Sequence, residues 1–118
     1  MILLTAQSDI LIALPPQDFR CGIDGFAGLC RNKFKQNPQN GTFFVFINRA
    51  KTMVRVLAYD GQGYWLMTKR LSKGKFKYWP TGSDDLTAVA AKHLRQLLQN
   101  VGPQDFTAIN REKGEDNS

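Results

Sequence analysis

Residues 42–70 read T-F-F-V-F-I-N-R-A-K-T-M-V-R-V-L-A-Y-D-G-Q-G-Y-W-L-M-T-K-R. The first seven are β-formers with nearly continuous apolar character, which predicts a central strand over 42–48 that is covered on both faces. From Met53 to Tyr59 the small apolar residues Val54, Val56 and Ala58 alternate with larger side chains, which predicts a second strand. Asp60-Gly61 is typical of a tight hairpin turn because glycine accepts a positive φ, and a third strand follows over 63–70.

The chain before this stretch predicts a short strand and a helix. Residues 9–14 are mostly apolar and stop at Pro15-Pro16, which cannot continue a ladder. Helical spacing of apolar residues then predicts an amphipathic helix over 22–36. Gly25 and Gly28 lie one turn apart in it, which suggests that another element packs closely there.

The chain after the hairpin predicts one more strand and the longest helix. Phe76 to Trp79 read as a short strand that ends at Pro80. Ser83 is a candidate N-cap, and apolar residues at helical spacing continue to Val101, before Gly102-Pro103. We expect an α+β fold, a curled antiparallel β-meander of about four to five strands packed by two amphipathic helices. It forms a single domain over 1–106, with a polar tail over 107–118.

Length and composition favour a soluble, cytoplasmic protein. The chain has 118 residues, of which 42% are hydrophobic and 22% charged, as in globular domains. No apolar run is long enough to span a bilayer, and no leader is expected, so we predict no membrane association. Two cysteines and one histidine cannot supply a four-ligand zinc site, and no metal or other cofactor is expected.

Charge is concentrated in the middle of the chain. The formal net charge is +6, and residues 20–79 hold twelve bases and only two acids. Such a segment is typical of a protein that binds a polyanion, although a solubilising surface would have the same composition.

The run from Thr68 to Pro80 combines five bases with three aromatic residues and contains no acid. Bases neutralise phosphate and aromatic rings stack on bases, so this combination favours nucleic-acid binding. The alternative is an ordinary edge strand whose lysines guard against aggregation. The candidate nucleic-acid-binding residues are Arg49, Lys51, Arg55, Lys69, Arg70, Lys73, Lys75, Lys77 and Trp79.

Catalytic groups are sparse. The acids before the tail are explained by helix starts and turns, and none forms the converging set that a metal-dependent nuclease needs. The glycines of Asp60-Gly61-Gln62-Gly63 join two predicted strands, a context that favours a hairpin turn over a phosphate-binding loop. We therefore expect no enzyme activity and no catalytic residues.

Several short motifs, taken in order, resemble one known family. They are Asp18–Gly25 (D-F-R-C-G-I-D-G), Phe44–Phe46, Tyr59–Gly63, Lys69–Phe76 and Trp79-Pro80. The chain resembles the TnpB-type small accessory protein of insertion sequences of the sixty-six family, which is unrelated to the RNA-guided nuclease of that name. The resemblance covers about Leu11 to Pro80 and extends more loosely to the last helix.

Two departures from the family pattern and one pairing bear on the site. Ala58 stands where an aromatic residue is usual, and the turn Asn48–Lys51 is poorer in arginine than is typical. Both departures favour Lys69 to Lys77 as the binding segment. Within the first motif, Arg20 and Asp24 are expected to form a structural pair.

The resemblance implies a non-catalytic helper of DNA transposition that acts beside a separate transposase. We expect it to bind DNA, at element ends or non-specifically, through a basic sheet surface. The alternative is a protein-interaction module, using Trp65, Trp79 and the last helix, that docks on the transposase or assembles into a homo-oligomer without contacting DNA.

Overall fold

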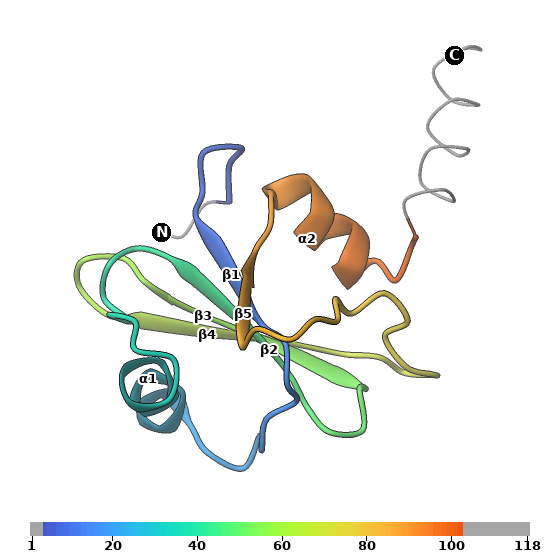
Figure 1. The fold of residues 1–118 in the computed structure, drawn as a ribbon, viewed down its shortest axis with the longest axis horizontal. Coiled ribbons are helices and arrows are strands. Elements are labelled where there is room, and N and C mark those ends of the chain that lie inside the picture. The colour runs from blue at the N-terminus through green and yellow to red at the C-terminus, as the bar shows by residue number, and fades with distance from the viewer. Residues whose placement is uncertain (1–3, 103–118) are drawn as a thin grey trace.

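A computed structural model describes residues 4–102, so the predicted tail over 107–118 lies outside the described residues. One sheet and two helices make up the fold (Figure 1). The elements are β1 (Ile10–Ala13), α1 (Ile23–Asn32), β2 (Phe43–Ile47), β3 (Met53–Tyr59), β4 (Tyr64–Arg70), β5 (Leu86–Ala88) and α2 (Ala91–Leu98). The predicted α+β class with five strands and two helices is confirmed.

The sheet has the strand order β4-β3-β2-β1-β5 and is mixed. The meander β2–β3–β4 is antiparallel, as predicted, but β1 pairs in parallel with β2 and antiparallel with β5. The prediction of a purely antiparallel sheet is therefore wrong. The reason is the connection through α1. It carries the chain from the C-terminal end of β1 back to the end of the sheet at which β1 starts, so β2 must run in the same direction as β1.

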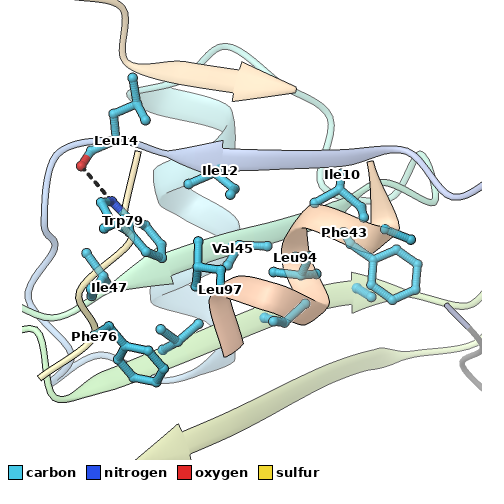
Figure 2. Close-up of a cluster of buried hydrophobic side chains, with 14 residues drawn as sticks. Ile10, Ile12, Leu14, Phe43, Val45, Ile47, Phe76, Trp79, Leu94 and Leu97 are labelled. Carbon is cyan, nitrogen blue, oxygen red and sulfur yellow. Dashed lines mark hydrogen bonds between the residues drawn. The ribbon is translucent and has the colours of Figure 1, made fainter. Parts of the chain in front are cut away.

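The two faces of the sheet bury separate cores. On one face α2 presents Leu94 and Leu97 to Ile12, Val45 and neighbouring side chains, as Figure 2 shows. On the other face α1 covers an aromatic core that includes Phe26, Phe44 and Phe46. All five residues of β2 are buried because their side chains alternate between these two cores, which confirms the predicted central strand.

Two predicted elements are wrong. Residues 76–79 are not a strand: Phe76 and Trp79 both join the core on the α2 face, a spacing of three that the two-residue alternation of a strand does not produce. The helix begins at Ala91 rather than after Ser83, and Leu86–Ala88 pairs with β1 instead. Leu86 belongs to the α1-side core, whereas the α2 residues belong to the other, so their shared helical spacing was misleading.

The two glycines of α1 occupy different environments. A Cβ at Gly25 would lie 2.3 Å from Cβ of Cys21, which precedes the N-cap residue Gly22. The nearest atom to a Cβ at Gly28 would be Asn32 Nδ2, at 3.9 Å. The predicted close approach therefore exists at Gly25 alone, and it comes from the chain entering α1.

Because Gly25 and Gly28 have different surroundings, replacement by alanine is expected to have opposite effects on stability at the two positions. Gly28→Ala is expected to raise the free energy of unfolding by about 0.5–1 kcal/mol, because alanine lowers the entropy cost of forming a helix. Gly25→Ala is expected to lower it by about 1–3 kcal/mol, because the new methyl group overlaps a backbone-anchored Cβ. Urea denaturation of both variants checks the signs, and equal effects would contradict the close approach.

Candidate nucleic-acid interface

The site begins where two loops meet at one end of the sheet. The Gln17 N–H donates to the Ile47 carbonyl at 2.8 Å, and Gln17 forms a parallel bridge with Asn48. These contacts hold the loop after β1 beside the turn that joins β2 and β3.

The β2–β3 turn is fixed by one asparagine. Oδ1 of Asn48 accepts hydrogen bonds from the N–H groups of Thr52 at 2.9 Å and Met53 at 3.0 Å. Lys51 adopts φ 62°, the left-handed conformation that a tight turn of this kind requires. The turn therefore holds Arg49 and Lys51 in a defined backbone geometry, and both residues are exposed.

An open hollow of about 630 Å³ lies between the two loops on the α1 face. We call it the arginine hollow, and it is lined by Gln17, Asp18, Phe19, Arg20, Asn48, Arg49, Ala50, Met53 and Arg55. Its three arginines outnumber its single carboxylate, so it is positively charged. Arg70 lies opposite Met53, a lining residue, and its side chain leaves the same face of the sheet.

Arg55 forms the wall of the hollow and is already engaged. Its Nη1 donates to the Phe19 carbonyl at 2.8 Å and its Nε to Thr68 Oγ1 at 3.0 Å. Its Cζ lies 4.9 Å from the Phe19 ring centroid and 5.8 Å from that of Phe26. These cation–π and hydrogen-bond contacts tie the loop after β1 to the sheet, so Arg55 has a structural role.

Arg20 pairs with Asp18 rather than with Asp24, which corrects the expected structural pair. The Arg20 Nη2 lies 2.7 Å from Asp18 Oδ2, and this hydrogen-bonded contact lowers the pKa of Asp18 to about 2. Arg49 adds a smaller lowering of the same pKa through its charge. The Arg20 side chain is 91% exposed, so its guanidinium is also open to solvent.

The segment after β4 runs along the other flank of the same turn. The Leu71 N–H donates to the Thr52 carbonyl at 3.0 Å, and the Phe76 N–H donates to the Lys51 carbonyl at 2.8 Å. The chain between these anchors, with Lys73 and Lys75, therefore lies beside the β2–β3 turn (Figure 1).

We call this surface the basic end, and its cations are Arg49, Lys51, Arg70, Lys73 and Lys75. All five are exposed, and within residues 4–102 their side chains make no hydrogen bond or ion pair. Their charges are therefore available to an external anion.

Three of the predicted site residues lie away from this surface. Lys69 is on the α2 face, where its Nζ donates to the Leu98 carbonyl at the end of α2. Lys77 lies in the segment bound to Asn100, which accepts from its N–H at 2.7 Å. Trp79 is 9% exposed and its Nε1 donates to the Leu14 carbonyl at 3.0 Å, so it offers no ring face to a base (Figure 2).

Acidic residues limit the basic end on one side. Lys51 shares a second hollow of about 310 Å³ with Asp84, Asp85 and Trp79. An anion is therefore favoured on the side of the arginine hollow and disfavoured on the side of these aspartates.

The glycine-rich turn between β3 and β4 is a hairpin turn, as predicted. Asp60 Oδ1 accepts from the N–H groups of Gln62 and Gly63, and Oδ2 accepts from Trp65 Nε1 at 2.8 Å. The bond from Trp65, together with the two backbone bonds, lowers the pKa of Asp60 to about 2. Because Asp60 already uses these N–H groups, they are not available to cradle a phosphate.

Cys30 is buried in the α1-side core, and burial raises the pKa of its thiol to about 12. Cys21 is half-buried, and both cysteines are free thiols. Across residues 4–102, no three His, Cys, Asp or Glu side chains come close enough together to hold a metal ion. Neither described helix is long and apolar enough to cross a membrane.

Sequence reasoning missed Arg20 and the hollow. Residues 17–20 and 48–55 come together through the parallel bridge between Gln17 and Asn48. A parallel pairing between distant segments leaves no local pattern, so the sequence contained no signal for it beyond the two motifs themselves.

The fold and the site together define a small basic α+β protein with exposed cations gathered at one end of an open sheet. The sequence model of the IS66 Orf2-like protein family matches residues 8–108. The chain therefore belongs to this family, which confirms the resemblance and implies an accessory protein associated with transposition.

Two similar proteins come from Sinorhizobium fredii (strain NBRC 101917 / NGR234). The uncharacterized protein y4hO is 36% identical over 92 residues, which cover 78% of this chain and 79% of its own length. The uncharacterized protein y4jC is 37% identical over 102 residues, which cover 86% and 84%. No solved structure matches the chain.

Proposed function

We propose that this protein assists transposition by binding DNA through the basic end and the adjoining arginine hollow. The binding depends on phosphate charge more than on base sequence. It needs no cofactor and no catalytic residue of this chain, and it takes place in the cytoplasm beside the element-encoded transposase.

The observation that carries the proposal is the meeting of three segments at one end of the sheet. The β2–β3 turn, the segment 71–76 and the loop 17–20 bring cations from distant parts of the chain onto one exposed surface. Cations without internal partners release the counterions of a phosphate backbone when DNA binds, which supplies the free energy of binding. Trp79 is not part of this surface.

A salt titration with a charge-reversed variant tests the proposal. Five phosphate contacts predict that log K falls with log[salt] with a slope of about −4.5. The triple variant Arg49→Glu/Lys73→Glu/Lys75→Glu retains two contacts and should show a slope of about −2, with DNA affinity lowered at least about a hundredfold at low salt. Fluorescence anisotropy with labelled duplex measures both quantities. Lys51 stays unchanged because its positive φ makes a substitution there ambiguous.

The matched control changes net charge by the same amount elsewhere. Arg31 and Lys33 are exposed at the C-terminal end of α1, where Arg31 contacts Tyr64 at the end of the sheet opposite the β2–β3 turn, and Arg95 lies exposed on α2. Arg31→Glu/Lys33→Glu/Arg95→Glu should weaken binding only a few-fold, through general electrostatics. Equal losses in both triple variants, or a wild-type affinity that does not respond to salt, would reject the proposed surface.

A second function is an interaction module that docks on the transposase without contacting DNA. The observation that favours it is exposed apolar surface on β4, where Trp65 is 44% and Met67 36% exposed. Copurification of the transposase with the folded Arg49→Glu/Lys73→Glu/Lys75→Glu variant, together with no DNA binding by the wild type, would select this function.

A further inference from the structure

The sheet has one long free edge, β4. The other edge strand, β5, has three residues, whereas β4 has seven (Figure 1). A long edge strand presents unpaired N–H and C=O groups to which another strand can bind.

The hairpin's hydrogen bonds establish which backbone groups of β4 are unpaired. At the turn the Asp60 N–H donates to the Gly63 carbonyl, and at the far end the Leu71 N–H donates to the Thr52 carbonyl. Hydrogen-bonded and non-hydrogen-bonded pairs alternate in an antiparallel ladder. The odd-numbered residues from 65 to 69 therefore bond to β3, and Tyr64, Leu66, Thr68 and Arg70 direct their N–H and C=O groups outward.

The side chains of β4 are ordered along the strand. Aromatic residues, Tyr64 and Trp65, stand at its start, and cations, Lys69 and Arg70, stand at its end. Met67 is at the centre and forms the outer wall of an apolar groove of about 260 Å³ beside Leu94 and Leu98 of α2.

We infer that β4 pairs antiparallel with β4 of a second copy of this chain, about a two-fold axis at Met67. In this register Trp65 lies opposite Lys69 of the other copy, and Tyr64 lies opposite Arg70. All seven residues are paired, and the Tyr64 ring faces the guanidinium of Arg70, a favourable contact, whereas the Lys69 ammonium opposite Trp65 already donates to the Leu98 carbonyl. The inference does not require DNA binding, although Arg70 is also one of the five cations of the basic end.

Backbone parity and charge both favour this register. The outward-directed residues 64, 66, 68 and 70 pair only with one another, as a hydrogen-bonded ladder requires. Shifting the axis to Lys69 or Arg70 would place like charges opposite each other, which is destabilising. Pairing uses both copies of the long edge and leaves only β5 edges, so the assembly closes as a dimer.

Engineered disulfides test the register, in a Cys21→Ser background that leaves only the buried Cys30 thiol. Met67→Cys places two thiols at a non-hydrogen-bonded pair with Cα atoms about 4.5 Å apart, a separation that a disulfide can span. Oxidation should therefore convert most of the Met67→Cys protein to a covalent dimer. Trp65→Cys and Leu66→Cys should remain largely monomeric on a non-reducing gel. Preferential cross-linking at residue 65 or 66 would overturn the register.

The oligomeric state of the uncross-linked chain tests the pairing itself. The wild type should sediment with twice the mass of one chain. Thr68→Pro removes an outward-directed N–H and the hydroxyl contact with Arg55 but keeps the backbone hydrogen bonds between β4 and β3, and it should sediment as a folded monomer. Thr68→Val removes the same hydroxyl contact with Arg55 and keeps the N–H, so it should remain a dimer. A monomeric wild type, including one whose β4 binds another protein instead, would overturn the inference, as would a dimer that survives Thr68→Pro.

Discussion

Trp79→Ala is expected to lower the free energy of unfolding by about 3–5 kcal/mol, because it removes a large buried side chain and leaves a cavity on the α2 face. Trp79 packs in a core with Phe76, Leu94 and Leu97, and its Nε1 satisfies the Leu14 carbonyl. Urea denaturation at one protein concentration measures the change, provided that the m-value stays constant.

The chain's other tryptophan is the matched control. Trp65 is 44% exposed and lies on β4, so Trp65→Ala should cost less than about 1.5 kcal/mol. Trp79→Phe keeps most of the buried ring and should cost about 1–3 kcal/mol, since it leaves the Leu14 carbonyl without its donor. If folded Trp79→Phe lost DNA affinity while Arg49→Glu/Lys73→Glu/Lys75→Glu kept it, Trp79 would be a contact residue and our placement of the surface would be wrong.

Phe26→Ala is expected to lower the free energy of unfolding by about 3–5 kcal/mol, through the core on the opposite face. Phe26 is fully buried, and its ring lies 4.9 Å from that of Phe46 and 5.4 Å from that of Phe19. The guanidinium of Arg55 also lies over this ring, so the substitution loosens the wall of the arginine hollow as well.

Phe26→Met separates volume from aromatic character. It keeps most of the side-chain volume and should cost about 1–2 kcal/mol. Thermal or urea unfolding of the two variants compares them. Equal losses would show that the ring contacts, rather than the cavity, determine the stability of the α1-side core.

Local patterns predicted the parts of the fold that local physics determines. The Asp60-Gly61 turn and the alternation in β3 predicted the hairpin, and the spacing of Phe26 and Cys30 predicted α1. The direction of β1 relative to β2 could not be predicted from such patterns, because it depends on how the helix between them crosses the sheet.

The error at residues 83–90 has a specific cause. Leu86 and Val89 continue the helical spacing of α2 in the N-terminal direction, so periodicity extended the helix too far. The competing interaction is the pairing of Leu86–Ala88 with β1, a partner more than seventy positions away in the sequence. Tertiary pairing of this kind overrides helical spacing, and no window of local sequence contains it.

The candidate site was partly predictable for the same reason. Charge counting identified the basic segment and five cations that lie together at the basic end. It also included Trp79, because the composition of a segment does not show whether the ring of an aromatic residue among lysines is exposed or buried. Arg20 was missed as part of the basic surface, since its neighbours in space follow from the bridge between Gln17 and Asn48.

The position of β1 also has a consequence for synthesis of the chain. Ile12 is paired with Thr87, so β1 lacks one of its two neighbours until about 75 further residues have been translated. At about 5–20 residues per second this delay is roughly 4–15 seconds. During that interval the backbone N–H and C=O groups along this edge of β1 have no strand to pair with, so the edge is open to pairing with another chain until β5 has been made.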